Sequence, residues 1–208
     1  RCGCRRIFVC GESAAGDVAA ASSLKLRSQI AGIGLYYPVV LAGNDASASW
    51  KSFGKGFGLD GALMDAFNEA YAPGALADDP LVSPLAAKEF EGYPKTLLVA
   101  AECDILRDQG VKFARILKEN GVSAERVVMP GALHAFMTYP NMENAYRNGL
   151  RLAAEFIDNA EKESKMQGLG PDAIVRLSKI EVDSARLREY VALATECGRT
   201  SMDCHLKT

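Results

Sequence analysis

No stretch of the 208-residue chain is apolar over the roughly 18 residues that a membrane-spanning helix requires, and no signal peptide begins it. An excess of charge of one sign is also lacking, since 24 Lys and Arg face 26 Asp and Glu for a formal net charge of −2. The chain therefore has no basic surface of the kind that binds nucleic acid or an anionic membrane. We expect no nucleic-acid partner and no membrane span.

An initiator Met is missing as well. The chain starts at Arg1, and an apolar strand begins within a few residues. We therefore expect an amino-terminal region to precede this sequence in the natural protein. For that reason the missing signal peptide says little about the compartment, and a cytoplasmic location is favoured only as a default.

A second close pair of cysteines at zinc-ligand spacing is not found. Cys2 and Cys4 form one pair, and no matching pair follows among the six cysteines. Cys10 and Cys103 lie in apolar strand contexts, where a free cysteine packs as a small hydrophobic side chain. We expect no bound metal, and we predict that Cys10 and Cys103 are buried.

The chain does contain an alternation of strands and helices, and 49% of its residues are hydrophobic, which suffices for one sizeable core. The predicted elements are strand 7–10, helix 14–26, a strand over 33–41 that ends near Pro38, strand 95–101, a helix from Asp108 to a stop at Gly121, strand 125–129, and a long helix capped by Asn141. This alternation is typical of a parallel sheet covered on both faces, so the predicted fold class is α/β.

Residues 42–80 interrupt the alternation with a composition rich in Gly, Ser, Ala and Asp. One predicted helix stands out there, capped by Asp60, with Leu63, Met64, Phe67 and Tyr71 on a single face. We interpret segment 42–80 as a helical cap over a pocket. The alternative is a packed connecting helix.

A second change of pattern occurs at Gly168-Leu169-Gly170-Pro171. We assign residues 1–166 to one unit, 167–170 to a linker, and 171–208 to a truncated second unit with a strand near 174–182 and a following helix. A segment of this length buries too little surface to form a core by itself.

A serine follows the first predicted strand in a sharp turn. Ile7-Phe8-Val9-Cys10 runs into Gly11-Glu12-Ser13-Ala14-Ala15-Gly16 and then into a helix of small residues. The glycine before the serine permits the reversal that lifts the hydroxyl above the sheet, and the N–H groups at the start of the helix point to the same spot. This pattern predicts that Ser13 is a nucleophile for acyl transfer.

A serine hydroxyl needs a base to take its proton and a carboxylate to orient that base. The chain has two histidines, and His205 lies in a polar tail, so His134 is the candidate base. Three acids lie near the end of the third strand. Asp104 is favoured because the carboxyl ends of parallel strands collect catalytic groups. Asp108 is explained by a helix N-cap, and Glu102 lies closer to the strand body.

Four motifs carry a resemblance to a known family. They are Gly11-Glu12-Ser13-Ala14-Ala15-Gly16, Ser83-Pro84-Leu85, the stretch 101–108, and the stretch 131–136. In these motifs, and in the chain order serine, acid, histidine, residues 5–160 resemble the hormone-sensitive-lipase-like esterases. These are α/β-hydrolases that cleave carboxylic esters, often with short acyl chains, beneath a helical cap.

The resemblance implies the carboxyl-terminal half of an α/β-hydrolase. It implies Ser13 as nucleophile, Asp104 as acid, His134 as base and the Ala14 N–H as one oxyanion donor. It also implies a small-molecule ester as substrate and no cofactor.

The sequence departs from the family pattern in two places. Ala15 stands where the family has Gly, and its methyl group is expected to strain the turn by about 1–3 kcal/mol. Ala is the mildest such change, so we expect the turn to survive. The family's His-Gly-Gly loop, which donates further oxyanion N–H groups, should precede Ser13 and is not in this sequence. Strand 7–10 would then be an exposed sheet edge. We expect the 208-residue chain alone to aggregate or show little esterase activity, and the full-length parent to be an esterase.

Residues 171–208 resemble a different family, the antibiotic-biosynthesis-monooxygenase-like domains, through residues 174–183 and 185–190. Those domains are small ferredoxin-like α+β barrels that usually dimerise, so a homodimer is a further expectation. No catalytic residue is carried over. The alternative is a linker followed by an amphipathic helix.

Two other functions stay open. The same triad and fold serve serine peptidases and other acyl-transfer hydrolases, which a comparison of short-chain esters with peptide amides distinguishes. Related folds also become non-catalytic small-molecule receptors by losing triad members, and the presence of all three members here argues against that function.

Overall fold

The structure is a computed structural model that describes residues 7–166. Its centre is a four-stranded parallel sheet in the order β1-β2-β3-β4. The strands are β1 (Ile7–Glu12), β2 (Ile30–Tyr36), β3 (Lys95–Cys103) and β4 (Ala124–Leu133). The predicted α/β class is thereby confirmed. The linker 167–170, the segment 171–208 and its predicted strand and helix lie outside the described residues.

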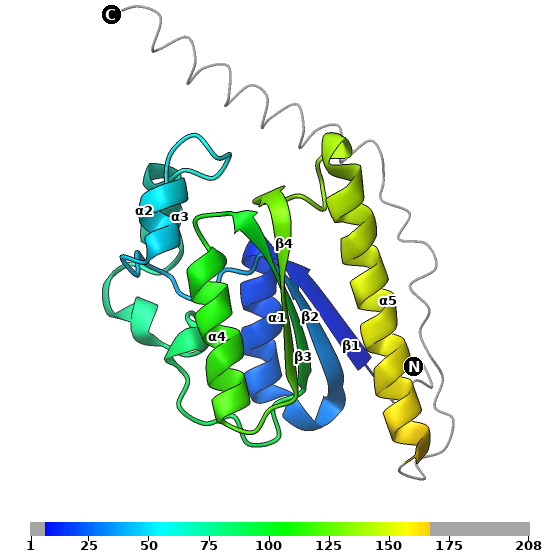
Figure 1. The fold of residues 1–208 in the computed structure, drawn as a ribbon. Helices are drawn as coiled ribbons and strands as arrows, with labels where there is room; N and C mark the ends of the chain where they lie inside the picture. The colour runs from blue at the N-terminus through cyan, green and yellow to red at the C-terminus, as the bar shows by residue number, and fades with distance from the viewer. Residues whose placement is uncertain (1–6, 167–208) are drawn as a thin grey trace, which may run out of the picture. The chain divides into compact units, whose positions relative to one another are not determined.

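Helices cover both faces of the sheet, as Figure 1 shows. Helices α1 (Ser13–Lys25) and α4 (Arg107–Glu119) lie on one face, and α5 (Glu143–Met166) lies on the other. Short helical turns connect the elements at η1 (Arg27–Gln29), η2 (Gly74–Asp78), η3 (Pro84–Ala86) and η4 (Pro140–Met142). The three layers follow from strands that are apolar on both sides.

Each face of the sheet has its own apolar core. The core beneath α1 and α4 contains Ile33, Leu35 and Phe113, all fully buried, and the core beneath α5 contains Val99 and Phe156. The two β2 residues lie on the same face because they are two positions apart along the strand. These cores hold the strands rigidly, so the residues that leave the carboxyl ends of the strands start from fixed positions.

Small residues let α1 approach the sheet closely. Ala19, Ala20 and Ser23 are buried on this helix, and Ser23 donates to the Ala19 carbonyl within it. A Cβ atom on Gly16 would lie 2.7 Å from the Pro38 Cβ, so this glycine is required for the contact. The position of Ser13 at the start of α1 is therefore tied to the segment that follows β2.

Segment 42–80 contains α2 (Ala48–Phe53) and α3 (Gly61–Tyr71). Trp50 of α2 and Met64 of α3 pack on Ile105 and Leu106, which follow β3. The predicted apolar face of α3 is only partly buried, because Leu63, Phe67 and Tyr71 are exposed within the described part of the chain while Met64 is buried. Asp60 is the N-cap residue of α3, and its side chain accepts a hydrogen bond from the Gly56 N–H.

Two predicted strands have different limits in the structure. β2 begins three residues earlier than predicted and ends at Tyr36, because Tyr37 adopts a left-handed φ of 36°. β4 is longer than predicted and continues through Gly131 to Leu133, where it pairs with Cys103 across a register shift.

The prediction that Cys10 is buried is wrong. Cys10 is exposed, since β1 pairs only with β2 within residues 7–166 and its outer edge is open. Cys103 is partly exposed at the end of β3. No helix within the described residues is long and apolar enough to cross a membrane.

Candidate active site

Ser13 lies at a sharp turn between β1 and α1. It is the first residue of α1 and has a φ of 50°, in the left-handed region that non-glycine residues rarely adopt. A Cβ on Gly11 would lie 2.2 Å from the Ala15 carbonyl oxygen, so only glycine fits two residues before the serine. The Ser13 carbonyl accepts a hydrogen bond from the Val39 N–H at 3.0 Å, which ties the turn to the segment after β2.

The close approach in this turn is made by backbone atoms. The three atoms that a Cβ on Gly11 would meet first belong to the backbone of Ala15 and Gly16, and Ala15 itself is exposed. The backbone of Ala15 and Gly16 therefore closes the space beside Gly11, and the strain expected from the Ala15 methyl group stays a prediction.

His134 follows β4 directly and connects two of the predicted site residues. Its Nε2 lies 2.9 Å from the Ser13 Oγ, and its Nδ1 lies 2.9 Å from the Asp104 Oδ2. Asp104 is 1% exposed and His134 is 9% exposed, so this contact is shielded from water. Ser13 and His134 are 121 positions apart along the chain, and Asp104 and His134 are 30 positions apart. The fold thus brings the three side chains together at one edge of the sheet.

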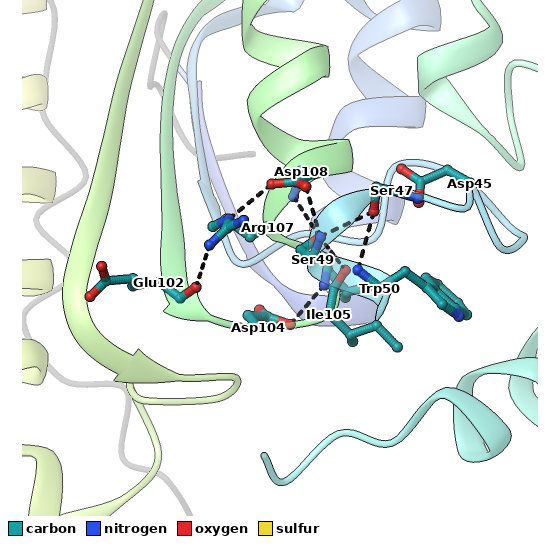
Figure 2. Close-up of polar contacts among 10 residues, drawn as sticks. Asp45, Ser47, Ser49, Trp50, Glu102, Asp104, Ile105, Arg107 and Asp108 are labelled. Atoms are coloured by element: carbon teal, nitrogen blue, oxygen red, sulfur yellow. Dashed lines mark hydrogen bonds and ion pairs between the residues drawn. The ribbon is translucent and has the colours of Figure 1, made fainter. Parts of the chain in front are cut away.

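The three acids near the end of β3 have different partners. Asp104 accepts from His134 and, through Oδ1, from the Leu106 N–H at 2.9 Å. Glu102 accepts from the Gly131 N–H at 2.7 Å. Asp108 accepts from the Arg107 side chain and from the Ser49 N–H, as Figure 2 shows for the residues around this loop.

The prediction that Asp108 caps α4 is wrong. The N-cap residue of α4 is Leu106, and Asp108 is the second residue of the helix. The helix starts earlier because the Asp104 carboxylate and carbonyl accept from the N–H groups of Leu106 and Arg107 and turn the chain at once. Burial opposes ionisation of Asp108, but hydrogen bonds from Arg107 and Ser49 and the Arg107 charge hold its pKa below the ordinary value.

Tyr37 and Glu12 support the site and were not among the predicted site residues. The Tyr37 ring packs edge-on against His134 at 5.0 Å between ring centroids, and its hydroxyl donates to Glu12 Oε2 at 2.5 Å. The same hydroxyl accepts from the Met137 N–H at 3.3 Å. Burial, followed by the hydrogen bond to Glu12, raises the pKa of Tyr37 well above its ordinary value. Their positions in the sequence could have indicated a role at the site, since Glu12 directly precedes Ser13 and Tyr37 directly precedes Pro38 at the end of a strand.

Ala14 lies in the first turn of α1, directly after Ser13. The first N–H groups of an α-helix have no partner within the helix, and they carry the positive end of the helix dipole. The Ala14 N–H is thus a donor of the kind that stabilises a negative oxygen. Within residues 7–166, no group of three or more His, Cys, Asp or Glu residues is arranged to hold a metal ion.

The arrangement of these residues is chemically suited to moving a proton from the serine hydroxyl. A hydroxyl, an imidazole and a buried carboxylate form one line of hydrogen bonds, in which the carboxylate fixes the imidazole orientation. The hydroxyl stands at the start of a helix, where a negative charge that develops nearby is stabilised.

Comparisons with known proteins find esterases among the proteins that this chain resembles. The chain is 34% identical over 161 residues to an ethyl acetate hydrolase of Pseudomonas putida, a match that covers 73% of this chain and 49% of that protein. It is 35% identical over 143 residues to an arylesterase of Saccharolobus solfataricus, covering 65% and 45% of the two chains. A solved structure of a hyperthermophilic esterase from Pyrobaculum calidifontis superposes with a TM-score of 0.69 at 31% identity, covering 74% and 53%.

The chain spans about half the length of the curated relatives it matches. A family profile described as the alpha/beta hydrolase fold matches residues 1–138, which is more than half of the chain. The matched residues include the parallel sheet and the turn at Ser13. The chain therefore belongs to the α/β-hydrolase-fold family.

Proposed function

We propose that the natural protein is a carboxylic-ester hydrolase of the hormone-sensitive-lipase-like group, with Ser13, His134 and Asp104 as its catalytic triad. The observation that carries the proposal is the continuous line of hydrogen bonds from the Ser13 hydroxyl through both His134 nitrogens to the buried Asp104 carboxylate, with 2.9 Å at each step. The names of the relatives, ethyl acetate hydrolase and arylesterase, support an ester as the substrate.

The proposed reaction has two halves. Ser13 Oγ attacks the ester carbonyl carbon while His134 Nε2 accepts the hydroxyl proton, and the negative charge develops on the carbonyl oxygen near the Ala14 N–H. The tetrahedral intermediate collapses when the carbon–oxygen bond to the alcohol breaks and His134 gives its proton to the leaving alcohol. Water then attacks the acyl-enzyme with His134 as base, which releases the carboxylic acid and restores Ser13.

Asp104 orients the imidazole in this scheme. Its Oδ2 accepts from Nδ1, which keeps Nε2 facing the serine hydroxyl. None of the proposed steps draws on a metal or an organic cofactor.

The substrate is proposed to be a small ester with a short acyl group, held beneath segment 42–80. The placement of α2 and α3 beside the loop that follows β3 supports this cap, because Trp50 and Met64 pack on Ile105 next to Asp104. The relative named for ethyl acetate supports the short acyl group. Further oxyanion donors are proposed to come from a His-Gly-Gly loop in an amino-terminal region of the natural protein.

The test uses the complete natural polypeptide that carries this sequence. We expect a fluorophosphonate probe to label the protein and short-chain p-nitrophenyl esters to be hydrolysed, both of which Ser13→Ala should abolish. Ser52→Ala removes an exposed serine of α2 and should change neither result.

Other outcomes point to the two alternative functions. Faster cleavage of peptide amides than of esters would favour a serine peptidase. A folded wild-type protein that resists the probe and cleaves neither class of compound would favour a non-catalytic binding protein.

A further inference from the structure

Ser49 of α2 is fully buried and contacts the loop that carries Asp104. Its Oγ donates to the Ile105 carbonyl at 2.9 Å and accepts from the Asp108 N–H at 3.2 Å. Its own N–H donates to Asp108 Oδ2 at 2.8 Å. Figure 2 shows these bonds between α2 and the loop that leads into α4.

The peptide group between Ile105 and Leu106 connects Ser49 to Asp104. Its carbonyl accepts from Ser49, and its N–H donates to Asp104 Oδ1 at 2.9 Å. Because the peptide unit is planar and rigid, a rotation that moves its carbonyl also moves its N–H. The hydroxyl of Ser49 therefore restrains the N–H group that orients the Asp104 carboxylate.

The other oxygen of Asp104 is the one that faces His134. Oδ2 lies 2.9 Å from His134 Nδ1, so any rotation of the carboxylate released at Oδ1 also changes the contact at Oδ2. Asp104 is 1% exposed, and no solvent competes to hold the carboxylate in another orientation. The contacts therefore lead from Ser49 through the Ile105–Leu106 peptide group and Asp104 to the His134 imidazole.

Asp108 keeps Ser49 in this position. Its Oδ2 accepts from the Ser49 N–H while its Oδ1 accepts from Arg107 Nε at 2.9 Å. Arg107 also donates to the Glu102 carbonyl at 3.1 Å. Because Glu102 belongs to β3, this bond attaches the Arg107–Asp108 pair to the sheet. Both oxygens of Asp108 are satisfied, and the charge is paired.

We infer that Ser49 is a positioning residue for the proposed reaction, which acts through the Ile105–Leu106 peptide group to fix the orientation of Asp104 toward His134. The inference rests on the proposed function and deepens it. It makes segment 42–80 a support for the catalytic acid as well as a cover for the substrate. A rival role would be ordinary anchoring of α2, in which Ser49 would affect stability and leave the imidazole undisturbed.

Ser47 offers a matched control as the N-cap residue of the same helix. Its Oγ accepts from the Trp50 N–H at 3.3 Å, and it lies 3.2 Å from the Ser49 Oγ. A serine hydroxyl has one proton to donate, and Ser49 gives its proton to the Ile105 carbonyl. Ser47→Ala therefore removes the N-cap bond and the contact with Ser49 Oγ, but it keeps the Ser49 hydroxyl that donates to the Ile105 carbonyl.

The experiment compares Ser49→Ala, Ser49→Thr and Ser47→Ala with wild type in the complete natural polypeptide. Steady-state hydrolysis of a short-chain p-nitrophenyl ester should show kcat about 10- to 100-fold lower in Ser49→Ala with KM unchanged. Ser49→Thr, which keeps the hydroxyl, should recover most of kcat, and Ser47→Ala should retain wild-type kcat. Thermal unfolding of each variant reports how much stability each change removes.

A second readout does not depend on ester hydrolysis. The low-field proton resonance of the bond between His134 Nδ1 and Asp104 should shift in Ser49→Ala and stay in place in Ser47→Ala. If wild type neither hydrolyses esters nor reacts with a fluorophosphonate, yet this resonance responds as described, the proposed function fails and the positioning role stands. An unmoved resonance in Ser49→Ala, or equal losses of kcat in Ser49→Ala and Ser47→Ala, would overturn the inference.

Discussion

Asp17 lies on α1, four residues after Ser13, and its carboxylate is poorly compensated. It is 3% exposed, its Oδ2 accepts from the Tyr71 hydroxyl at 3.2 Å, and its Oδ1 is buried without a hydrogen-bond partner among the described residues. Burial raises its pKa from 3.8 to about 6, and the bond from Tyr71 only partly opposes this. The charged form is therefore costly in the native state.

The sign of the effect on stability follows from the direction of the shift. An acid whose pKa is higher in the folded state than in the unfolded state binds its proton more tightly when folded, so the native state loses stability as pH rises from about 4 to about 6. With the pKa near 6 in the folded state and 3.8 in the unfolded state, about 2 kcal/mol is lost between pH 4 and pH 7.5.

Asp17→Asn removes this titration while keeping the shape of the side chain. The free energy of unfolding, measured by urea denaturation of the complete polypeptide, should fall between pH 4 and pH 7.5 by about 2 kcal/mol less in the variant than in wild type. If the new amide group changes the free energy of unfolding by the same amount at both pH values, this comparison between variant and wild type is unaffected. Asp65→Asn, which removes the charge of an exposed aspartate of α3, is the matched control for the loss of one carboxylate. Parallel curves for Asp17→Asn and wild type would refute the argument.

Two further predictions concern the turn at Ser13 and the edge of the sheet. Gly11→Ala should remove fluorophosphonate labelling and destabilise the protein by about 1–3 kcal/mol, because the added methyl group would meet the backbone. At Gly43 an added Cβ would meet no atom within 4 Å, so Gly43→Ala should affect neither the labelling nor the stability. The 208-residue chain produced alone should elute as aggregates in size-exclusion chromatography or hydrolyse esters poorly, since β1 has an open edge with Ile7 49% exposed. A monodisperse and fully active 208-residue chain would contradict this expectation.

The order of strands and helices could be predicted because it depends on local patterns. α1 and α4 begin within one residue of their predicted starts, since a small-residue run after a turn and an i, i+3, i+4 apolar pattern are both local signals. The meeting of Ser13, Asp104 and His134 could also be expected, because each leaves the carboxyl end of a strand in one parallel sheet.

Burial at the periphery could not be predicted in the same way. Cys10 and the α3 side chains Leu63 and Phe67 have apolar patterns, yet they are exposed in the described part of the chain, because burial depends on which elements come to cover them. The contact of Ser49 with Ile105 joins residues 56 positions apart and has no local signature. A single serine in a polar segment resembles any other until the fold places it.

The backbone conformations around Ser13 and His134 could not be predicted from local patterns either. Ser13, Tyr37 and Ala135 adopt φ values of 50°, 36° and 62°, which cost non-glycine residues on the order of 1–3 kcal/mol each. Glycine would remove that cost, but at Ser13 and Tyr37 it would also remove a hydroxyl 2.9 Å from His134 and a ring packed against it. Such conformations persist only where surrounding contacts enforce them, as the bond from the Tyr37 N–H to the Val99 carbonyl at 2.7 Å does. At Ser13 and Tyr37 the site needs a side chain at a point where the fold needs a reversal of direction, so local propensity alone does not predict these conformations.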